Sequence, residues 1–250
     1  MNSSSGQPAL SQRIAFLRTV PLLAALPERD LIILCQDFSL RDYRKGQFVF
    51  HQGDPSRELY IVLKGKVRIF RVSLAGDETS VNIFSTGDII GECAMIDQQT
   101  RSASAQAVGR CALLEMWGDR FLQHMREMPD LALEMVRLLT GKLRWTTTFA
   151  ETIAQYDAAG RLLHILLLYN ERFGQEQIVG KRYVLDLALN QADLATLVGV
   201  RRERINRLLQ DWSRRGLIEY DDGKLIILDL PRVRQERDSR NEAALDKEEW

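Results

Sequence analysis

The sequence has few cysteines, few histidines and no long hydrophobic run, and each absence excludes a class of protein. The cysteines are widely spaced and form no Cys-x-x-Cys pair, so we expect buried thiols in a reducing compartment and not disulfides or a metal cage (Cys35, Cys93 and Cys111). The histidines also lack metal-ligand spacing, and each is expected to be structural. No apolar run reaches the roughly 18 residues that span a bilayer, so we expect no membrane-spanning helix.

The sequence also lacks the motifs of secretion and of the common catalytic sites. Its first residues, MNSSSGQPALSQR, contain no charged segment followed by an apolar one, so we expect no secretory signal and a cytoplasmic protein. No Ser–His–Asp order, metal-ligand spacing or glycine-rich phosphate loop is present in the sequence. We therefore expect a binding protein and not an enzyme.

The chain contains enough apolar sequence for two hydrophobic cores. Its 250 residues are 45% hydrophobic, which suffices for two domains of roughly 100 to 150 residues each. The net charge is zero and the pI is about 6.9, values that alone argue against binding to nucleic acid. The basic charge is nevertheless concentrated, because residues 199–216 contain six arginines against one glutamate and one aspartate.

Two short helices joined by a tight turn are predicted for the segment NQADLATLVGVRRERINRLLQDWSRRG. The first helix is expected from Gln191 to Leu197, and Gly199 follows where the turn favours a positive φ. The small Ala195 and the β-branched Ile205 let the two helices cross closely, as they do in a DNA-binding helix-turn-helix. An ordinary helical hairpin with a solvated basic face is the alternative.

The second of these helices has an apolar face and a charged face. Its apolar residues recur at i, i+3, i+4 and i+7 (Ile205, Leu208, Leu209 and Trp212). The opposite face offers charged and amide side chains to a partner (Arg201, Arg202, Glu203, Arg204, Asn206 and Arg207). We expect this charged face to enter the major groove of double-stranded DNA.

The residue pattern changes along the chain and predicts an α+β fold. Over residues 38–116, short β-rich runs separated by glycine-bearing turns indicate an antiparallel roll or barrel. Over 118–170 the apolar period is that of a helix. A β-rich stretch at 177–188 precedes the helix-turn-helix, and LIEYDDGKLIIL after it predicts a hairpin, the wing of a winged helix. The final residues alternate in charge, which indicates a solvated, mobile tail.

These patterns divide the chain into four segments, of which the second is a long helix. The expected segments are N-terminal helices and a β-roll (1–128), a long dimerisation helix (129–156), a winged helix-turn-helix (157–230) and a charged tail (231–250). In the long helix, apolar residues and one threonine recur at alternating spacings of three and four (Val136, Leu139, Leu143, Thr146, Ala150 and Ile153). This seam predicts pairing with a second copy of the helix, which would place two recognition helices one DNA turn apart.

A candidate ligand site lies in the β-rich region, in the run GDIIGECAMIDQQTRSASA. A cyclic phosphodiester needs a cation for its phosphate, backbone N–H donors, and a carboxylate for the ribose 2′-hydroxyl group. Arg101, the short helical turn after Glu92, and Glu92 itself can supply these in that order, and Ser102 adds a hydroxyl donor. The predicted site comprises Gly91, Glu92, Cys93, Arg101, Ser102 and Ala103.

In these motifs the chain resembles the cyclic-AMP receptor protein/FNR family of bacterial transcription regulators, over roughly Leu22 to Leu228. The resemblance implies a cyclic-nucleotide-binding β-roll, a long dimerisation helix and a C-terminal winged helix-turn-helix, in that order. It implies cyclic AMP as the effector, a homodimer that binds DNA, and RNA polymerase as a further partner. The family's phosphate-binding cassette matches at Gly91, Glu92, Arg101 and Ser102.

The resemblance also assigns a role to the polar part of the long helix. Thr146 and Thr147 fall where the dimer helix of the family contacts the adenine, and Thr147 is expected to reach the partner's ligand. From the residues alone, Thr146 is equally explained as a polar residue that sets the register of the seam. The implied mechanism is a two-state switch, in which the ligand favours one arrangement of the dimer helices and so places both recognition helices on DNA.

The second helix of the predicted helix-turn-helix, which is the recognition helix, matches the family in its base-reading residues. Arg202, Glu203 and Arg207 suit a near-palindromic operator with TGTGA-like half-sites, because arginine pairs with guanine O6 and N7 and glutamate accepts from cytosine N4. The remaining arginines are expected to contact phosphates (Arg201, Arg204 and Arg214).

The chain departs from the family pattern near the ligand site. The loop between Glu92 and Arg101 is about one residue shorter than in the family pattern, and Cys93 replaces an aliphatic residue. In the dimer helix, Gly141 and Lys142 occupy two positions at which the family pattern has basic residues. The N-terminal cysteines of the iron–sulfur members are absent and no haem-ligating histidine can be assigned, so we expect no metal, iron–sulfur cluster or haem. The cassette arginine is kept, which favours a cyclic mononucleotide, and the resemblance makes cyclic AMP the expected one. A constitutive regulator, a response to cyclic GMP or cyclic di-GMP, and a regulatory subunit of an enzyme are the alternatives.

Overall fold

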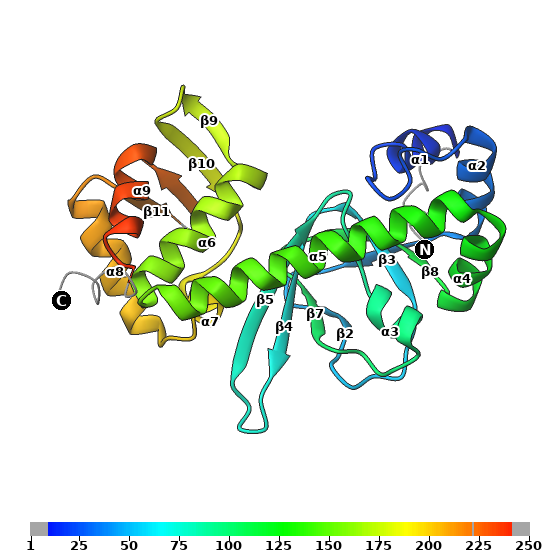
Figure 1. The fold of residues 1–250 in the computed structure, drawn as a ribbon, viewed down its shortest axis with the longest axis horizontal. Helices are drawn as coiled ribbons and strands as arrows, with labels where there is room; N and C mark the ends of the chain where they lie inside the picture. Colours follow the sequence, from blue (N-terminus) through cyan, green and yellow to red (C-terminus); the bar gives the residue numbers. More distant parts are fainter. Residues whose placement is uncertain (1–9, 222, 242–250) are drawn as a thin grey trace, which may run out of the picture. The chain divides into compact units, whose positions relative to one another are not determined.

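The computed structural model describes residues 10–221 and 223–241, which form two compact units. The first unit contains the chain up to Asp77 together with Val81–Leu143, and the second contains Glu78–Ser80 and the chain from Arg144 onward. Figure 1 shows the helices and strands of both units. In the described ranges, no helix has the length and apolar character needed to cross a membrane.

The first unit consists of helices and a β-roll of two antiparallel sheets. Its strands are ordered β1-β8-β3-β6 in one sheet and β2-β7-β4-β5 in the other. The helices are α1 (Leu10–Leu17), α2 (Glu28–Asp37), α3 (Glu92–Asp97), α4 (Gly118–Glu127) and the beginning of α5 (Pro129–Gln155). The strands are β1 (Ser39–Tyr43), β2 (Phe48–Phe50), β3 (Leu59–Lys64), β4 (Lys66–Val72), β5 (Glu78–Ser85), β6 (Ile89–Ile90), β7 (Ser104–Ala107) and β8 (Cys111–Met116). The predicted β-roll is confirmed.

Alternate residues of β3 contribute to two different apolar cores. Leu59 and Ile61 pack with the residues of α1, α2, α4 and the start of α5, and both are fully buried. Tyr60 and Val62 point to the other face of the sheet, where they join Val67 and other residues from the second sheet. This alternation follows from the two-residue period of a strand, and it explains why the run LYIVLK is apolar on both faces.

The long helix α5 carries exposed apolar side chains along the predicted seam. It is a single helix of 27 residues, as the periodicity predicts, and it begins in the first unit and ends in the second. Val136, Leu143 and Ile153 are 58%, 67% and 50% exposed in the single chain. Three large apolar residues in solvent along one line of a helix indicate a surface that a partner covers.

The second unit is a winged helix. Its sheet has the strand order β11-β12-β10-β9, and its hairpin β11–β12 pairs Ile218 with Ile227 and Asp221 with Lys224, which confirms the predicted wing. Trp212 and Leu194 are fully buried in its core. The helices are α6 (Ala158–Phe173), α7 (Gln191–Val198), α8 (Arg202–Arg214) and α9 (Leu230–Asp238). The strands are β9 (Gln175–Ile178), β10 (Arg182–Asp186), β11 (Ile218–Asp221) and β12 (Lys224–Ile227).

The expectation of a solvated tail from residue 231 is wrong for α9. The side chain of Asp229 accepts a hydrogen bond from the backbone N–H group of Arg232 and so caps this helix. Val233 is fully buried, and α9 packs against α6. Glu236 also pairs with Arg215, the C-cap residue that directly follows α8. The alternating charges thus belong partly to ion pairs of a packed helix, while residues 242–250 of the predicted tail lie outside the described residues.

Candidate functional site

Arg101 is held in the first unit by hydrogen bonds from every nitrogen of its guanidinium group. Nε donates to Oγ of Ser56 over 3.1 Å, and Nη1 donates to the carbonyl oxygen of Gly91 over 2.9 Å. Nη2 donates to the carbonyl oxygen and to Oε2 of Glu58, over 2.8 and 3.1 Å. The Arg101 residue is only 2% exposed. The charged end of this arginine is therefore fixed in position before any ligand binds.

Two aromatic rings complete the surroundings of this arginine. The guanidinium carbon of Arg101 lies 4.2 Å from the centre of the Phe50 ring and 5.8 Å from that of Tyr60. Burial lowers the pKa of Arg101 from its ordinary value, and the nearby Tyr60 and Glu58 oppose that change. Because an arginine side chain is not deprotonated in proteins, the group remains a cation. This candidate site thus contains a permanent positive charge in a largely dry setting, which suits an anionic group of a ligand.

Gly91 is required at its position because no larger residue fits beside Arg101. Its φ is +88°, a left-handed value that disfavours other residues. A Cβ atom at position 91 would lie 2.6 Å from the carbonyl oxygen of Glu58 and 2.7 Å from Nη1 of Arg101. The predicted association of Gly91 with Arg101 is therefore a direct contact between the two residues.

Glu92 opens α3 and is bound by a lysine from α5. Its residue is 4% exposed, and its Oε1 lies 2.8 Å from Nζ of Lys142. The same lysine donates to the carbonyl oxygen of Ile89 over 2.8 Å and lies over the Phe84 ring. Both ionic groups of the predicted ligand site, Arg101 and Glu92, therefore have partners of opposite charge within the first unit.

The remaining residues of the predicted ligand site differ in exposure. Cys93 is exposed, so the expectation that all three cysteines are buried is wrong for this residue, while Cys35 and Cys111 are buried. Desolvation of the thiol and the charge of Glu92 raise the pKa of Cys93 to about 11, and the thiol donates to Oε1 of Glu92 over 3.4 Å. Ser102 is exposed and Ala103 is 8% exposed, just before β7.

The predicted adenine contacts lie on α5, in the part of the helix that belongs to the second unit. Thr146 and Thr147 are both exposed residues there. Their role at a ligand stays a prediction, because it concerns a site formed in part by the first unit. The other predicted ligand residues all belong to the first unit and lie on α3, beside it, or just before β7 (Gly91, Glu92, Cys93, Arg101, Ser102 and Ala103).

Three residues that hold this candidate site together were not predicted from the sequence. Ser56 and Glu58 hold Arg101, and Lys142 holds Glu92. Glu58 directly precedes the strand LYIVLK, so its place at the edge of the sheet could have marked it as a candidate. Lys142 follows Glu92 by fifty positions in the sequence, and no local pattern links the two.

A second candidate site is the helix-turn-helix in the second unit. The helix α7 begins at a capping box, in which Asn190 accepts from the N–H groups of Ala192 and Asp193 while Asp193 accepts from the N–H group of Asn190. Gly199 follows with a φ of +70°, which confirms the left-handed turn predicted there. The helix α7 runs one residue further than predicted, to Val198.

The helix α8 presents its arginines to solvent. Ile205, Leu209 and Trp212 are buried on one side, while Leu208 is only half-buried. Among the described residues, carboxylates pair with Arg214 and Arg215 but not with the four arginines nearer the start of α8 (Arg201, Arg202, Arg204 and Arg207). These four residues are exposed, as is Glu203, and Asn206 is half-buried. The unneutralised charge at this end of α8 suits a polyanion such as DNA.

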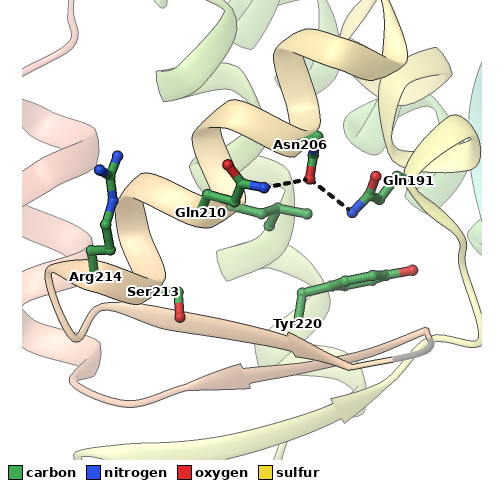
Figure 2. A pocket seen from close by; sticks show the side chains of 7 residues that line it. Gln191, Asn206, Gln210, Ser213, Arg214 and Tyr220 are labelled. Carbon is green, nitrogen blue, oxygen red and sulfur yellow. Dashed lines mark hydrogen bonds between the residues drawn. The ribbon is translucent and has the colours of Figure 1, made fainter.

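A polar recess of about 500 Å³ lies between α8 and the wing, as Figure 2 shows. Oδ1 of Asn206 accepts from Nε2 of Gln191 and from Nε2 of Gln210, both over 3.4 Å. The hydroxyl group of Tyr220 donates to the carbonyl oxygen of Leu189 over 2.9 Å. Asn206, predicted to face DNA, therefore also links α8 to the start of α7. The recess is lined by Gln191, Asn206, Leu209, Gln210, Ser213, Arg214 and Tyr220.

The two sites coincide with two known domain families. Residues 40–128 match the cyclic nucleotide-binding domain, and residues 160–236 match the Crp-like helix-turn-helix domain. Solved structures with the same fold include a CooA mutant from Carboxydothermus hydrogenoformans (TM-score 0.68, 23% identity, covering 81% of this chain and 88% of that one). Another is the c-di-GMP responsive global regulator CLP from Xanthomonas campestris (TM-score 0.68, 23% identity, covering 81% and 99%).

Curated relatives extend the match over both units. The chain is 31% identical over 192 residues to the CRP-like cAMP-activated global transcriptional regulator of Mycobacterium tuberculosis, covering 77% of this chain and 85% of the relative. It is 30% identical over 203 residues to the cyclic AMP receptor protein of Thermus thermophilus, covering 81% and 90%. The chain therefore belongs to the Crp/Fnr family of DNA-binding transcription regulators, with a cyclic nucleotide-binding domain and a Crp-like helix-turn-helix.

Proposed function

We propose that this chain acts as a homodimer whose affinity for a specific operator is switched by cyclic AMP bound in the β-roll. The observation that carries the proposal is the buried Arg101 cation, seated against Gly91 and nine positions after Glu92 in the sequence. Two relatives of 30% identity or more are a cAMP-activated regulator and a cyclic AMP receptor protein, and their names support the choice of nucleotide.

The pocket chemistry suits the two polar parts of a cyclic nucleotide. Arg101 supplies a fixed cation for the cyclic phosphate, and the hydroxyl group of Ser102 can donate to the same phosphate. Glu92 supplies an acceptor for the ribose 2′-hydroxyl group, which is the group that distinguishes ribose from deoxyribose. Thr146 and Thr147 on α5 are proposed to contact the adenine of the bound nucleotide.

The exposed seam of α5 supports the dimer. A homodimer would cover Val136, Leu143 and Ile153 by pairing two copies of α5. Because the same helix carries Lys142, the partner of Glu92, and the proposed adenine contacts, a ligand can favour one pairing of the helices over another. A differential affinity of a few kcal/mol is enough to move such a switch from mostly off to mostly on.

The proposed reading of DNA separates base contacts from phosphate contacts. Arg202→Ala should lower affinity for the preferred operator by about 1–3 kcal/mol and should relax specificity at one base pair, because a bidentate arginine–guanine contact is lost. Arg201→Ala is the matched control, and it should weaken binding to operator and random DNA about equally. Competition titrations with both DNAs at fixed salt measure the difference. Equal losses on both DNAs for Arg202→Ala would contradict its role as a base reader.

The whole proposal is tested by fluorescence anisotropy of a labelled TGTGA-N6-TCACA duplex titrated with the chain. The titrations are run with no nucleotide, cyclic AMP, cyclic GMP or cyclic di-GMP, at one salt concentration. We expect affinity to increase tenfold or more with cyclic AMP alone, through the coupling between ligand and DNA binding. Equal affinity under all four conditions would contradict a nucleotide switch.

A second candidate function is a Crp/Fnr regulator that binds DNA without a nucleotide or responds to another effector. The observation that favours it is the internal pairing of the pocket, in which Arg101 bonds Glu58 and Glu92 bonds Lys142. With both ionic groups paired, the pocket has no unsatisfied charge that demands a ligand. Tight operator binding in the absence of nucleotide would select this candidate over the first.

A further inference from the structure

We infer that Glu58 competes with the effector for Arg101 and so sets the effector concentration at which the pocket fills. This inference rests on the proposed function, because it assumes that a phosphate binds Arg101. It goes further by assigning a role to a residue outside the cassette motif. The Arg101 side chain is 1% exposed and that of Glu58 is 13% exposed, so the pair is largely shielded from water.

The hydrogen-bond capacity of Arg101 shows why the two anions compete. An arginine has five N–H groups, and four hydrogen bonds from Arg101 go to Ser56, Gly91 and Glu58. A phosphate bound in the bidentate manner of arginine needs two N–H groups at once. Only one N–H group of Arg101 remains after these four bonds. The arginine must therefore break one of its existing hydrogen bonds before it can form the second bond to the phosphate.

The Glu58 carboxylate is the partner that a phosphate can best replace. The carbonyl oxygens of Gly91 and Glu58 belong to the backbone and cannot move away without a shift of the chain. Ser56 accepts from Nε, and not from either of the two terminal nitrogens of the guanidinium group. Oε2 of Glu58 is a side-chain oxygen at 3.1 Å, and the side chain is partly exposed. Its carboxylate also carries the same charge as the phosphate, so the phosphate can replace it without leaving Arg101 unpaired.

The contacts of Arg101 also distinguish two roles for Glu58, which are competition with the effector and orientation of the arginine. If Glu58 served to orient Arg101, its loss would weaken effector binding. The guanidinium group, however, is already fixed by three other bonds, including one to the backbone of Glu58 itself. Asp54 also adds negative charge near Arg101, but its Oδ2 accepts from the N–H group of His51. Glu58 is thus the acid whose charge bonds Arg101 directly within the described chain.

Glu58→Gln tests the inference because it removes the charge and keeps the shape. A neutral amide bonds arginine less strongly than a carboxylate, so the full-length variant should bind cyclic AMP about tenfold more tightly than the wild type by calorimetry. The cyclic AMP concentration for half-maximal operator binding should fall by a similar factor. Glu115→Gln is the matched control, because Glu115 pairs with Arg41 on the same sheet, and it should leave both values unchanged.

A double-mutant cycle with Arg101→Leu shows whether Glu58 acts through Arg101. If Glu58 and the phosphate compete for Arg101, the increase in cyclic AMP affinity caused by Glu58→Gln should vanish when Arg101 is replaced by leucine. A similar gain on both backgrounds would mean a general effect of charge and would overturn the inference. Thermal melting of each variant by circular dichroism confirms that the variants compared are folded.

The outcomes separate this inference from the function on which it rests. Cyclic AMP binding by the wild type with equal or weaker binding by Glu58→Gln would overturn the competition and leave the proposed function standing. No binding of cyclic AMP by the wild type or by Glu58→Gln would overturn both. Detectable binding by Glu58→Gln alone would support the competition, because the wild-type carboxylate would then be the barrier to the ligand, and would overturn the proposed response of the wild type to cyclic AMP.

Discussion

Replacing Arg101 with leucine should remove the response to cyclic AMP and leave the operator affinity at its nucleotide-free value. Arg101 is the only basic residue of the predicted cassette, and its guanidinium group is fixed by Ser56, Gly91 and Glu58. Hydrogen bonds to a charged group contribute about 1.5–3 kcal/mol each, so losing even one lowers nucleotide affinity by roughly ten- to a hundredfold. Calorimetry with cyclic AMP measures the affinity, and anisotropy with the operator measures the response.

The control for this experiment removes a more exposed arginine–glutamate pair elsewhere in the β-roll. Arg41 on β1 pairs with Glu115 over 2.6 Å, and its side chain is 60% exposed. Arg41→Leu should keep the nucleotide affinity of the wild type. Arg101→Leu leaves Glu58 buried without its cation, so some loss of melting temperature is expected and must be measured. Unchanged nucleotide affinity in a folded Arg101→Leu protein would refute the phosphate contact.

The elements that the sequence predicted well are those encoded by neighbouring residues. The turn between α7 and α8 needs only Gly199, and α8 needs only its apolar spacing, with Ile205, Leu209 and Trp212 buried as expected. The association of Gly91 with Arg101 could also be predicted, because the two lie in one motif ten residues apart. Such local patterns can be recognised in the sequence because hydrophobic periodicity and turn preference depend on residues that are close to one another along the chain.

The features that could not be predicted depend on contacts between distant parts of the chain. Glu58 reaches Arg101 because the backbone of Gly53 and Asp54, shortly before β3, is hydrogen-bonded to that of Arg101. Lys142 reaches Glu92 only through the path of α5. The helix α9 was missed for a related reason. Its charges alternate like those of a solvated tail, and only the burial of Val233 and the pairing of Glu236 with Arg215 show that it packs. Long-range contacts of this kind leave no periodic signal in the sequence.

The seam of α5 leads to the second large expected effect, which is the loss of the dimer. Leu143 is 67% exposed in the single chain and lies at the centre of the predicted seam. Leu143→Asp would place two like charges against each other in an apolar interface, so the protein should become monomeric. Analytical ultracentrifugation measures this change directly. Two linked half-site contacts bind more tightly than one by about a hundredfold or more, so affinity for the full operator should fall by a similar factor.

A matched substitution shows whether that effect comes from the seam or from the helix. Leu133 is also an exposed apolar residue of α5, at 50%, but it lies outside the predicted seam. Leu133→Asp should therefore remain a dimer and keep its operator affinity. Affinity for a single half-site should be the same in both variants, because the winged helix is unchanged in each. If Leu143→Asp remained a dimer, or if Leu133→Asp became a monomer to the same extent, the surface that pairs two copies would lie elsewhere on the chain.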